Sequence, residues 1–281
     1  MSDHASLAAT AASAWGLPEP HLVHSGMSSV FGAGDDIVVR VGSSRFGAAA
    51  EAAWLDLMTS VDIRVPRLLH DIVEVDGVCI AAIERIRPSG AVDWREVGAM
   101  VRRVHEIDPL DAPGLPSCTA FPHWQIDDVL DDVAELIDRP ALDGMRGCLR
   151  RWDGWQAVAQ RGVVVCHGDI HPGNVLPTAD GPVLLDWDLR CMAPAGWDHA
   201  ALMTWSDRWD GQPGMYEAFA EGYDRNFRGE WMADAFAELR LLVATLMRLR
   251  AGRTSPAAAA EAERRLRYWR SDRDAPRWIP Q

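Results

Sequence analysis

Apolar positions along the chain follow two patterns, short continuous runs and runs at helical spacing, and each pattern predicts a type of element. The continuous runs predict strands at residues 37–41, 68–75, 78–84, 163–166, 175–176 and 182–185. Turn residues at 76–77 and 178–181 join two pairs of these strands into hairpins. Helical spacing predicts helices over 93–105, 126–137, 231–249 and 256–269. The first part of the chain is therefore rich in strands, and the last part is helical.

Polar residues with a recognisable chemistry follow two of these strands. Residues 167–174 read His-Gly-Asp-Ile-His-Pro-Gly-Asn, and residues 184–188 read Leu-Leu-Asp-Trp-Asp. An aspartate on a loop, Asp169, can accept the proton of an acceptor hydroxyl. The Asn174 amide oxygen can ligate Mg²⁺, and Asp186 can bridge Mg²⁺ to phosphates, because magnesium prefers oxygen ligands and needs few from the protein. This spacing indicates transfer of a phosphoryl group from a nucleotide.

The two motifs resemble those of the aminoglycoside phosphotransferase (APH) family, which are kinase-fold enzymes that phosphorylate small molecules. Residues 194–200, Pro-Ala-Gly-Trp-Asp-His-Ala, resemble a third family signature. The resemblance covers roughly residues 20–250 and implies an α+β, two-lobed, protein-kinase-like fold. We expect a small antiparallel-sheet N-lobe over residues 1–87 and a larger, mainly helical C-lobe over residues 88–281.

The family also implies a role for each matching residue. Asp169 matches the catalytic base, and His167 matches a residue that braces its loop. Asn174 and Asp186 match metal ligands. Asp198 matches a structural acid that supports the catalytic loop. Asp188 stands where relatives often have an acid, so it is either a possible substrate group or a group that supports other residues of the site.

A zinc site is an alternative interpretation of the same region. His167, Asp169 and His171 alternate along the chain, and the pair 198–199 is Asp-His. Alternating His and Asp side chains can bind zinc. This alternative gives no role to Asn174 or to the loop of Asp186.

The N-terminal lobe lacks the lysine that kinase folds usually place on the third strand. All 28 basic residues are arginine, which we attribute to a coding bias. Arg40 occupies the expected position, where some branches of the family carry arginine, and a guanidinium can bind phosphate oxygens bidentately. The resemblance makes Glu51, in an Ala-rich helix that follows, the expected partner of Arg40.

Two further stretches of this lobe resemble nucleotide-binding segments. Residues 25–34 resemble the phosphate loop, in which Ser28 and Ser29 can donate hydroxyl or backbone N–H groups, although a plain hairpin turn has the same composition. Glu84 and Ile86 lie in a segment that resembles the hinge between the lobes, where backbone groups receive the base.

Acidic residues gather on the helix predicted at 126–137. Six acids and no base occur in this short stretch: Asp127, Asp128, Asp131, Asp132, Glu135 and Asp138. They form either a solvated helix face or a wall that binds a cationic acceptor, as in family members that phosphorylate aminoglycosides. Asp127 and Asp131 are the substrate candidates here, and Glu230 and Asp234 are candidates on the later long helix.

Composition limits the partners. The net charge of −13 argues against nucleic-acid binding and suits a cationic acceptor. No apolar run is long enough to span a membrane, and the N-terminus has no secretory pattern. Five widely spaced cysteines without a C-x-x-C pair indicate free thiols in a reducing compartment. We therefore expect a cytoplasmic monomer or homodimer.

These observations predict a phosphotransferase that uses ATP or GTP with Mg²⁺. The favoured acceptor is a hydroxyl of a small cationic antibiotic, either an aminoglycoside or a basic peptide of the capreomycin/viomycin type, so that the enzyme confers resistance. One alternative is a metabolic kinase of the same fold that acts on a sugar, amino sugar or amino alcohol. A second alternative is a nucleotide-binding pseudokinase, which the complete set of Asp169, Asn174 and Asp186 disfavours.

Overall fold

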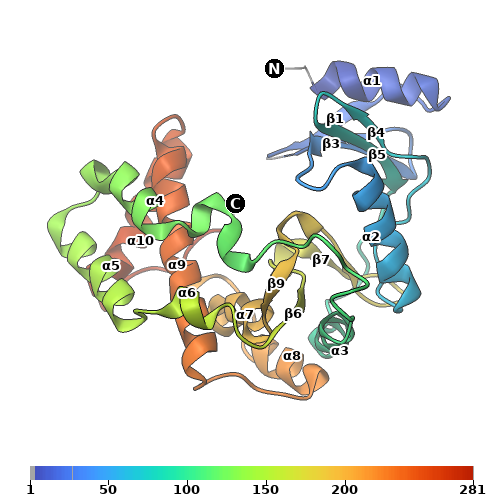
Figure 1. Ribbon diagram of the computed structural model, residues 1–281. Helices are drawn as coiled ribbons and strands as arrows, with labels where there is room; N and C mark the ends of the chain where they lie inside the picture. The colour runs from blue at the N-terminus through green and yellow to red at the C-terminus, as the bar shows by residue number, and fades with distance from the viewer. Residues whose placement is uncertain (1–3, 27, 281) are drawn as a thin grey trace. The chain divides into compact units, whose positions relative to one another are not determined.

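The computed structural model describes residues 4–26 and 28–280, which form two compact units (Figure 1). The first, called the sheet unit, contains residues 1–93 and 173–188. The second, called the helical unit, contains residues 94–172 and 189–281. The sequence-based division after residue 87 places 173–188 in the C-lobe, whereas this segment packs in the sheet unit. There the Leu184 N–H donates to the Arg64 carbonyl at 2.9 Å.

An antiparallel sheet of five strands forms most of the sheet unit, as the predicted fold class requires. Its strand order is β1-β2-β3-β5-β4. The strands are β1 (His21–Ser25), β2 (Ser29–Gly32), β3 (Ile37–Ser43), β4 (Val73–Val75) and β5 (Val78–Glu84). Two helices, α1 (His4–Ala14) and α2 (Ala48–Ser60), and a short hairpin of β7 (Val175–Leu176) and β8 (Val183–Leu184) complete the unit.

The core of the sheet unit explains where β3 directs its side chains. Ala8 and Ala11 of α1 pack in one cluster with Val39 and Val41 of β3, and both valines are fully buried. Successive side chains of a strand point to opposite faces. Arg40 therefore projects from the face of the sheet opposite this core.

The strand predicted over residues 68–75 is interrupted. Only β4, residues 73–75, pairs continuously with β5, while Leu68 forms an isolated bridge with Ile83. Between them, the His70 ring stacks on Trp15, with ring centroids 5.3 Å apart. This packing takes His70 out of the regular pattern of the strand.

The helical unit contains most of the helices of the chain (Figure 1). They are α3 (Trp94–His105), α4 (Ile126–Val133), α5 (Arg139–Arg151), α6 (Trp155–Val158), α7 (Gly196–Arg208), α8 (Met215–Tyr223), α9 (Trp231–Gly252) and α10 (Pro256–Trp269). Strands β6 (Val163–Cys166) and β9 (Cys191–Pro194) pair antiparallel. The helix predicted at 126–137 ends earlier, at Val133, and continues as a 3₁₀ turn over Ala134–Leu136.

Small and aromatic residues determine how these helices pack. Gly98 of α3 and Gly222 of α8 let the two helices approach closely, because a Cβ on Gly98 would lie 2.0 Å from the Phe219 carbonyl oxygen. The rings of Trp124, Trp155, Trp197 and Phe236 contact one another in the interior. No helix of the described residues is long and apolar enough to cross a membrane.

Candidate active site

The predicted catalytic loop, which begins at His167 in the helical unit, follows β6 directly and depends on one glycine. Gly168 has a φ of +92°, a conformation that favours glycine. A Cβ at this position would lie 1.9 Å from the Leu189 carbonyl oxygen. The close approach and the positive φ both exclude a larger residue between His167 and Asp169.

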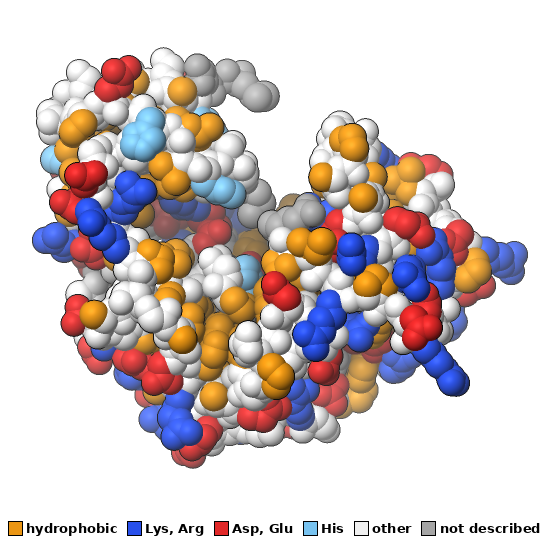
Figure 2. Space-filling view, turned by 180° about the vertical axis from the view of Figure 1, so that it is seen from behind, with side chains coloured by type: hydrophobic (Ala, Val, Ile, Leu, Met, Phe, Trp, Pro, Cys, Tyr) orange, Lys and Arg blue, Asp and Glu red, His pale blue; other side chains and the backbone are white. Residues whose placement is uncertain are grey.

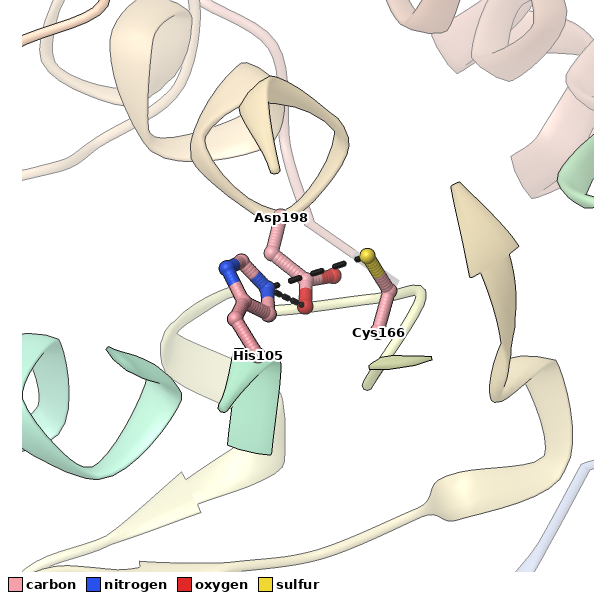
Figure 3. Close-up of side chains that lie close together, drawn as sticks. All are labelled: His105, Cys166 and Asp198. Carbon is pink, nitrogen blue, oxygen red and sulfur yellow. Dashed lines mark hydrogen bonds and ion pairs between the residues drawn. The ribbon is translucent and has the colours of Figure 1, made fainter. Parts of the chain in front are cut away.

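Asp198, at the start of α7, is the buried acid that holds the backbone of this loop. Its carboxylate accepts the His167 N–H at 2.8 Å and the Gly168 N–H at 2.7 Å. His105 Nε2 lies 3.1 Å from the same carboxylate (Figure 3). Burial raises the pKa of Asp198, but the hydrogen bond and charge of His105, the charge of His167 and the Gly168 N–H outweigh it and leave this pKa low. Asp198 is therefore an anion that anchors the loop.

A buried cysteine completes this cluster. Cys166 Sγ lies 3.7 Å from His105 Nε2 (Figure 3). Within residues 4–26 and 28–280, His105, Cys166 and Asp198 are the only His, Cys, Asp and Glu side chains grouped closely enough to hold a metal. Asp198 already accepts two backbone N–H groups, and His105 Nδ1 lies 2.8 Å from the Tyr223 hydroxyl. These bonds make the cluster a hydrogen-bonded brace of the loop.

The zinc alternative needs a different group, and the described residues do not form it. His167, Asp169 and His171 are not among the grouped side chains. His199 packs against Phe219, Tyr223 and other aromatic rings. Burial, followed by the charge of His105, lowers the pKa of His199 to about 3, so its ring is neutral.

Asp169 itself lies between two nitrogen-bearing side chains of the helical unit. Its Oδ1 is 3.2 Å from Arg240 Nη1, and its Oδ2 is 3.4 Å from His171 Nε2. The side chain retains 29% exposure, so it is accessible to a substrate. Burial raises the pKa of Asp169, but the hydrogen bond and charge of His171 and the charges of Arg240 and His167 bring it well below its ordinary value. Asp169 is therefore ionised at neutral pH and can accept a proton.

Arg240 is the residue that the sequence motifs missed. It lies on α9, 71 residues from Asp169, and matches none of the three signatures. One signal could have identified Arg240: it is a charged residue between two leucines, Leu239 and Leu241, which are both buried. Charged side chains are seldom buried without a partner.

The predicted metal ligands lie in the sheet unit, at the open end of the β7–β8 hairpin. Val175 pairs with Leu184, and the Leu185 N–H donates to the Asn174 carbonyl at 2.9 Å. Asp186 follows with a φ of +58°, a left-handed conformation that aspartate tolerates and that is often found at functional sites. An amide oxygen and a carboxylate held by one hairpin form a donor set that suits Mg²⁺.

Arg40 is bound by the acids of this metal loop. Its Nη2 lies 2.5 Å from Asp188 Oδ2 and 3.6 Å from Asp186 Oδ1. Burial lowers the pKa of Arg40, but Asp188 and Asp186 raise it by more, so it remains fully charged. Glu51, its expected partner, accepts a hydrogen bond from Ser44 Oγ at 2.7 Å and adds only a weaker charge effect on Arg40. Asp188, expected as a possible substrate group, provides the hydrogen bond to Arg40.

The predicted phosphate loop, residues 25–34, runs from the end of β1 through β2. The Gly26 N–H donates to the Ser28 carbonyl at 2.9 Å. Ser29 is buried, and its Oγ lies 2.9 Å from His4 Nδ1 of α1. A Cβ on Gly42 would lie 2.8 Å from Ser28 Cβ, so β3 runs close under this loop. Met27, inside the predicted loop, lies outside the described residues, and the loop remains a prediction.

At the predicted hinge, the Glu84 N–H donates to the Arg67 carbonyl at 3.0 Å. The Arg85 N–H donates to the Asp36 carbonyl at 2.8 Å. The base-binding role of Glu84 and Ile86 stays a prediction.

Three of the six clustered acids have basic partners at the C-terminal ends of α9 and α10. Asp132 binds Arg250 at 2.8 Å and Arg253 at 3.0 Å, and Glu135 binds Arg253 at 2.8 Å. Asp138 caps α5 and pairs with Arg270. Red and blue side chains are interspersed in the same way over the helical unit in Figure 2. Asp127, Asp128 and Asp131 are exposed.

Two acids of the C-terminal helices also have partners. Glu230 forms hydrogen bonds with Arg225, two of them at 3.0 Å. Asp234 Oδ1 accepts the Gly229 N–H at 3.2 Å. The structure therefore gives both predicted substrate acids a local role, and a role in acceptor binding remains a prediction.

The family model of the phosphotransferase enzyme family (APH) matches residues 23–239, and the chain belongs to this family. The protein is thus a kinase-type phosphotransferase. No curated protein matches the chain by sequence.

Solved structures of low sequence identity share its fold. Spectinomycin phosphotransferase APH(9)-Ia, in complex with ADP and spectinomycin, has a TM-score of 0.67 at 14% identity, covering 92% of this chain and 90% of that one. The aminoglycoside phosphotransferase APH(2")-IIIa, in complex with GDP and kanamycin, has a TM-score of 0.69 at 14% identity, with coverages of 92% and 94%. A choline/ethanolamine kinase family protein from Mesorhizobium loti has a TM-score of 0.63 at 18% identity, with coverages of 92% and 88%.

Proposed function

We propose that the protein transfers the γ-phosphoryl group of ATP or GTP to a hydroxyl of a small molecule, with Asp169 as the base. The observation that carries this proposal is an ionised, partly exposed carboxylate between Arg240 and His171, on a loop that Asp198 anchors. Asp169 orients the acceptor O–H and takes its proton. The acceptor oxygen forms the new bond to the γ-phosphorus, while the bond from that phosphorus to the β-bridging oxygen breaks and the nucleoside diphosphate leaves.

The sheet unit supplies the groups for the nucleotide. Asn174 and Asp186 would hold Mg²⁺, which neutralises phosphate charge when it is bound. Arg40 would donate to the phosphate oxygens, in exchange for part of its pairing with Asp188. Ser28, which precedes β2, and Ser29, the first residue of β2, would add donors. The nucleotide complexes of APH(9)-Ia and APH(2")-IIIa support a nucleotide as the co-substrate.

For the acceptor, we propose a small cationic antibiotic, such as an aminoglycoside or a basic peptide. The net charge of −13, the exposed Asp127 and Asp131 and the fold shared with enzymes bound to spectinomycin and kanamycin support this choice.

A metabolic acceptor, such as a sugar or an amino alcohol, is the second candidate, and one observation favours it. Asp132, Glu135 and Asp138 are neutralised by arginines, so half of the six clustered acids are not available to bind a cationic ligand.

A screen of nucleoside diphosphate release would test the function and the acceptor together. The purified protein would receive ATP or GTP with Mg²⁺ and a panel of aminoglycosides, basic peptides, amino sugars and amino alcohols. Asp169→Asn serves as the negative control. Release that depends on an acceptor and on Asp169 supports the proposal. Release that is equal in the wild type and in Asp169→Asn for every compound would exclude Asp169 as the base.

A further inference from the structure

Arg240 is buried in a setting that is unfavourable for a charged side chain. Its side chain is 13% exposed. Its guanidinium carbon lies 5.1 Å from the Trp197 ring centroid and 5.8 Å from that of Trp124. Its Nε is buried without a hydrogen-bond partner. Desolvation of a cation costs free energy unless strong partners compensate, so the partners of Arg240 should indicate why it is retained.

Both of those partners belong to the catalytic loop. Nη1 lies 3.2 Å from Asp169 Oδ1, and Nη2 donates to the Gly168 carbonyl. A guanidinium offers its donors in a rigid planar fork, so a single side chain can set the distance between a carbonyl and a carboxylate. The two tryptophan rings hold the plane of the fork, because cations pack favourably on aromatic faces.

From these contacts we infer that Arg240 is a positioning residue of the phosphoryl transfer, which fixes the Asp169 carboxylate relative to the backbone of its own loop. The inference rests on the proposed function. Arg240 keeps its proton throughout, and the proton of the acceptor hydroxyl goes to Asp169. A carboxylate has about four acceptor sites, so Asp169 can bind Arg240, His171 and a hydroxyl at once.

The chain offers a matched control for this arginine. Arg228 also donates to a backbone carbonyl, that of Met203, at 2.9 Å. It pairs with the Glu217 carboxylate at 3.4 Å and lies over the Tyr216 ring at 4.5 Å. These contacts involve α7 and α8, not the catalytic loop. Arg228→Gln therefore removes a similar set of interactions without touching Asp169.

The test compares Arg240→Gln, Arg240→Lys and Arg228→Gln by steady-state kinetics. We expect Arg240→Gln to lower kcat about 100-fold, because small displacements of a reacting group cost about that much, while the nucleotide KM stays within about twofold. Arg240→Lys keeps the charge but loses the fork, and should lose about tenfold. Arg228→Gln should keep the wild-type kcat. Added guanidinium should restore part of the activity of Arg240→Ala and none of that of Asp169→Asn.

Several outcomes would overturn the inference. One is a wild-type kcat in folded Arg240→Gln. Another is an equal loss in Arg240→Gln and Arg228→Gln, which would show a general packing effect. If Arg240→Gln does not fold, a lack of rescue of folded Arg240→Ala by guanidinium would contradict it as well.

A crystal structure of Arg240→Gln gives a readout without turnover. The Asp169 carboxylate should leave the position that it has in the wild type, and an unchanged Asp169 would contradict the inference. If Asp169→Asn loses activity while the Arg240 variants do not, only the role of Arg240 fails. If Asp169→Asn and the wild type are equally active, the proposed function fails, and the crystal structure still decides the role of Arg240.

Discussion

Each unit of the molecule contains an arginine bound to a predicted functional aspartate, and the two arginines differ in exposure. In the sheet unit, Arg40 is 33% exposed and binds Asp186 and Asp188 of the metal loop. In the helical unit, Arg240 is 13% exposed, lies over tryptophan rings and binds Asp169. Water and a ligand can replace an exposed ion pair at little cost, whereas breaking a buried pair leaves an uncompensated charge. The more accessible Arg40 therefore suits an arginine that exchanges its carboxylate partners for phosphates, and the more buried Arg240 suits one that stays in place.

The largest effect on the rate is expected in the helical unit, at the aspartate that Arg240 binds. Asp169→Asn removes the group that accepts the proton, a role typically worth about 10²–10⁴-fold in rate. Nucleotide affinity should remain nearly unchanged, because Asp169 is proposed to act on the proton of the acceptor and not on the nucleotide. Single-turnover kinetics and calorimetric titration of the nucleotide would measure the two quantities. A joint loss of turnover and affinity would assign Asp169 to the metal or to the structure instead.

Substitutions in the predicted metal loop should instead lower the affinity for the nucleotide. Asp186→Ala removes a charged metal ligand, and we expect Mg²⁺-dependent nucleotide affinity to fall by about 100-fold, since metal charge stabilisation is worth several kcal/mol. Asn174→Ala removes a neutral ligand and should have a smaller effect. Titration of the nucleotide with and without Mg²⁺ gives the measurement. An unchanged Mg²⁺ dependence in Asp186→Ala would contradict its assignment as a ligand.

Low pH should weaken the stabilisation that Asp198 provides. The pKa of Asp198 is lowered in the folded protein, in which its carboxylate accepts hydrogen bonds from His167, Gly168 and His105. The pKa of an aspartate in an unfolded chain is about 3.9. The stabilisation by Asp198 is therefore complete above that value and is lost as the pH falls through the lower folded pKa. Asp198→Asn should cost about 1–3 kcal/mol at pH 7 and flatten the dependence of Tm on pH below 4. An equally steep dependence in the variant would assign the acid sensitivity to other groups.

The charge pairing of Arg40 can be tested through its two candidate partners, Asp188 and Glu51. Asp188→Asn removes the charged hydrogen bond to Arg40 and should change the nucleotide KM about fivefold, because an ion pair of this exposure is worth up to about 1 kcal/mol. Glu51→Gln should change it about twofold, since Glu51 accepts a hydrogen bond from Ser44 at 2.7 Å and has a weaker charge effect on Arg40 than Asp188 has. Steady-state kinetics at saturating acceptor would measure both. The reverse order of effects would restore Glu51 as the main partner of Arg40.

The smallest effect concerns the exposed acids of α4. Charge reversal at Asp127 and Asp131 should raise the acceptor KM a few-fold, and high salt should remove the difference, because the Debye length falls from about 10 Å at 0.1 M to about 3 Å at 1 M. Reversal at Asp143, an exposed acid of α5 that lies in a pair with Arg139, is the control. A KM that responds to neither reversal nor salt would make α4 an ordinary solvated face and favour a neutral metabolic acceptor.

Local signals in the sequence were sufficient for several elements. Helix α10 begins and ends at the predicted residues, Pro256 and Trp269, because Ser255 caps it and a proline fits its first turn. The same holds for β5, which follows an Asp-Gly turn. The helix at 126–137 was predicted too long, since apolar spacing cannot distinguish an α-helix from the 3₁₀ turn that follows it.

The sequence by itself determined the family and the two kinds of lobe, and it predicted the residues of the catalytic and metal loops, because those signals lie within a few positions of one another. Only the tertiary structure decided which charges pair. Arg40 meets Asp188 across 148 positions, Arg240 meets Asp169 across 71, and Glu135 meets Arg253 across 118. Periodicity carries no information about a partner on a distant element, so charge pairing depends on how strands and helices pack. The packing made Arg240 a neighbour of Asp169, and it neutralised half of an acidic cluster that has no base in its own stretch of sequence.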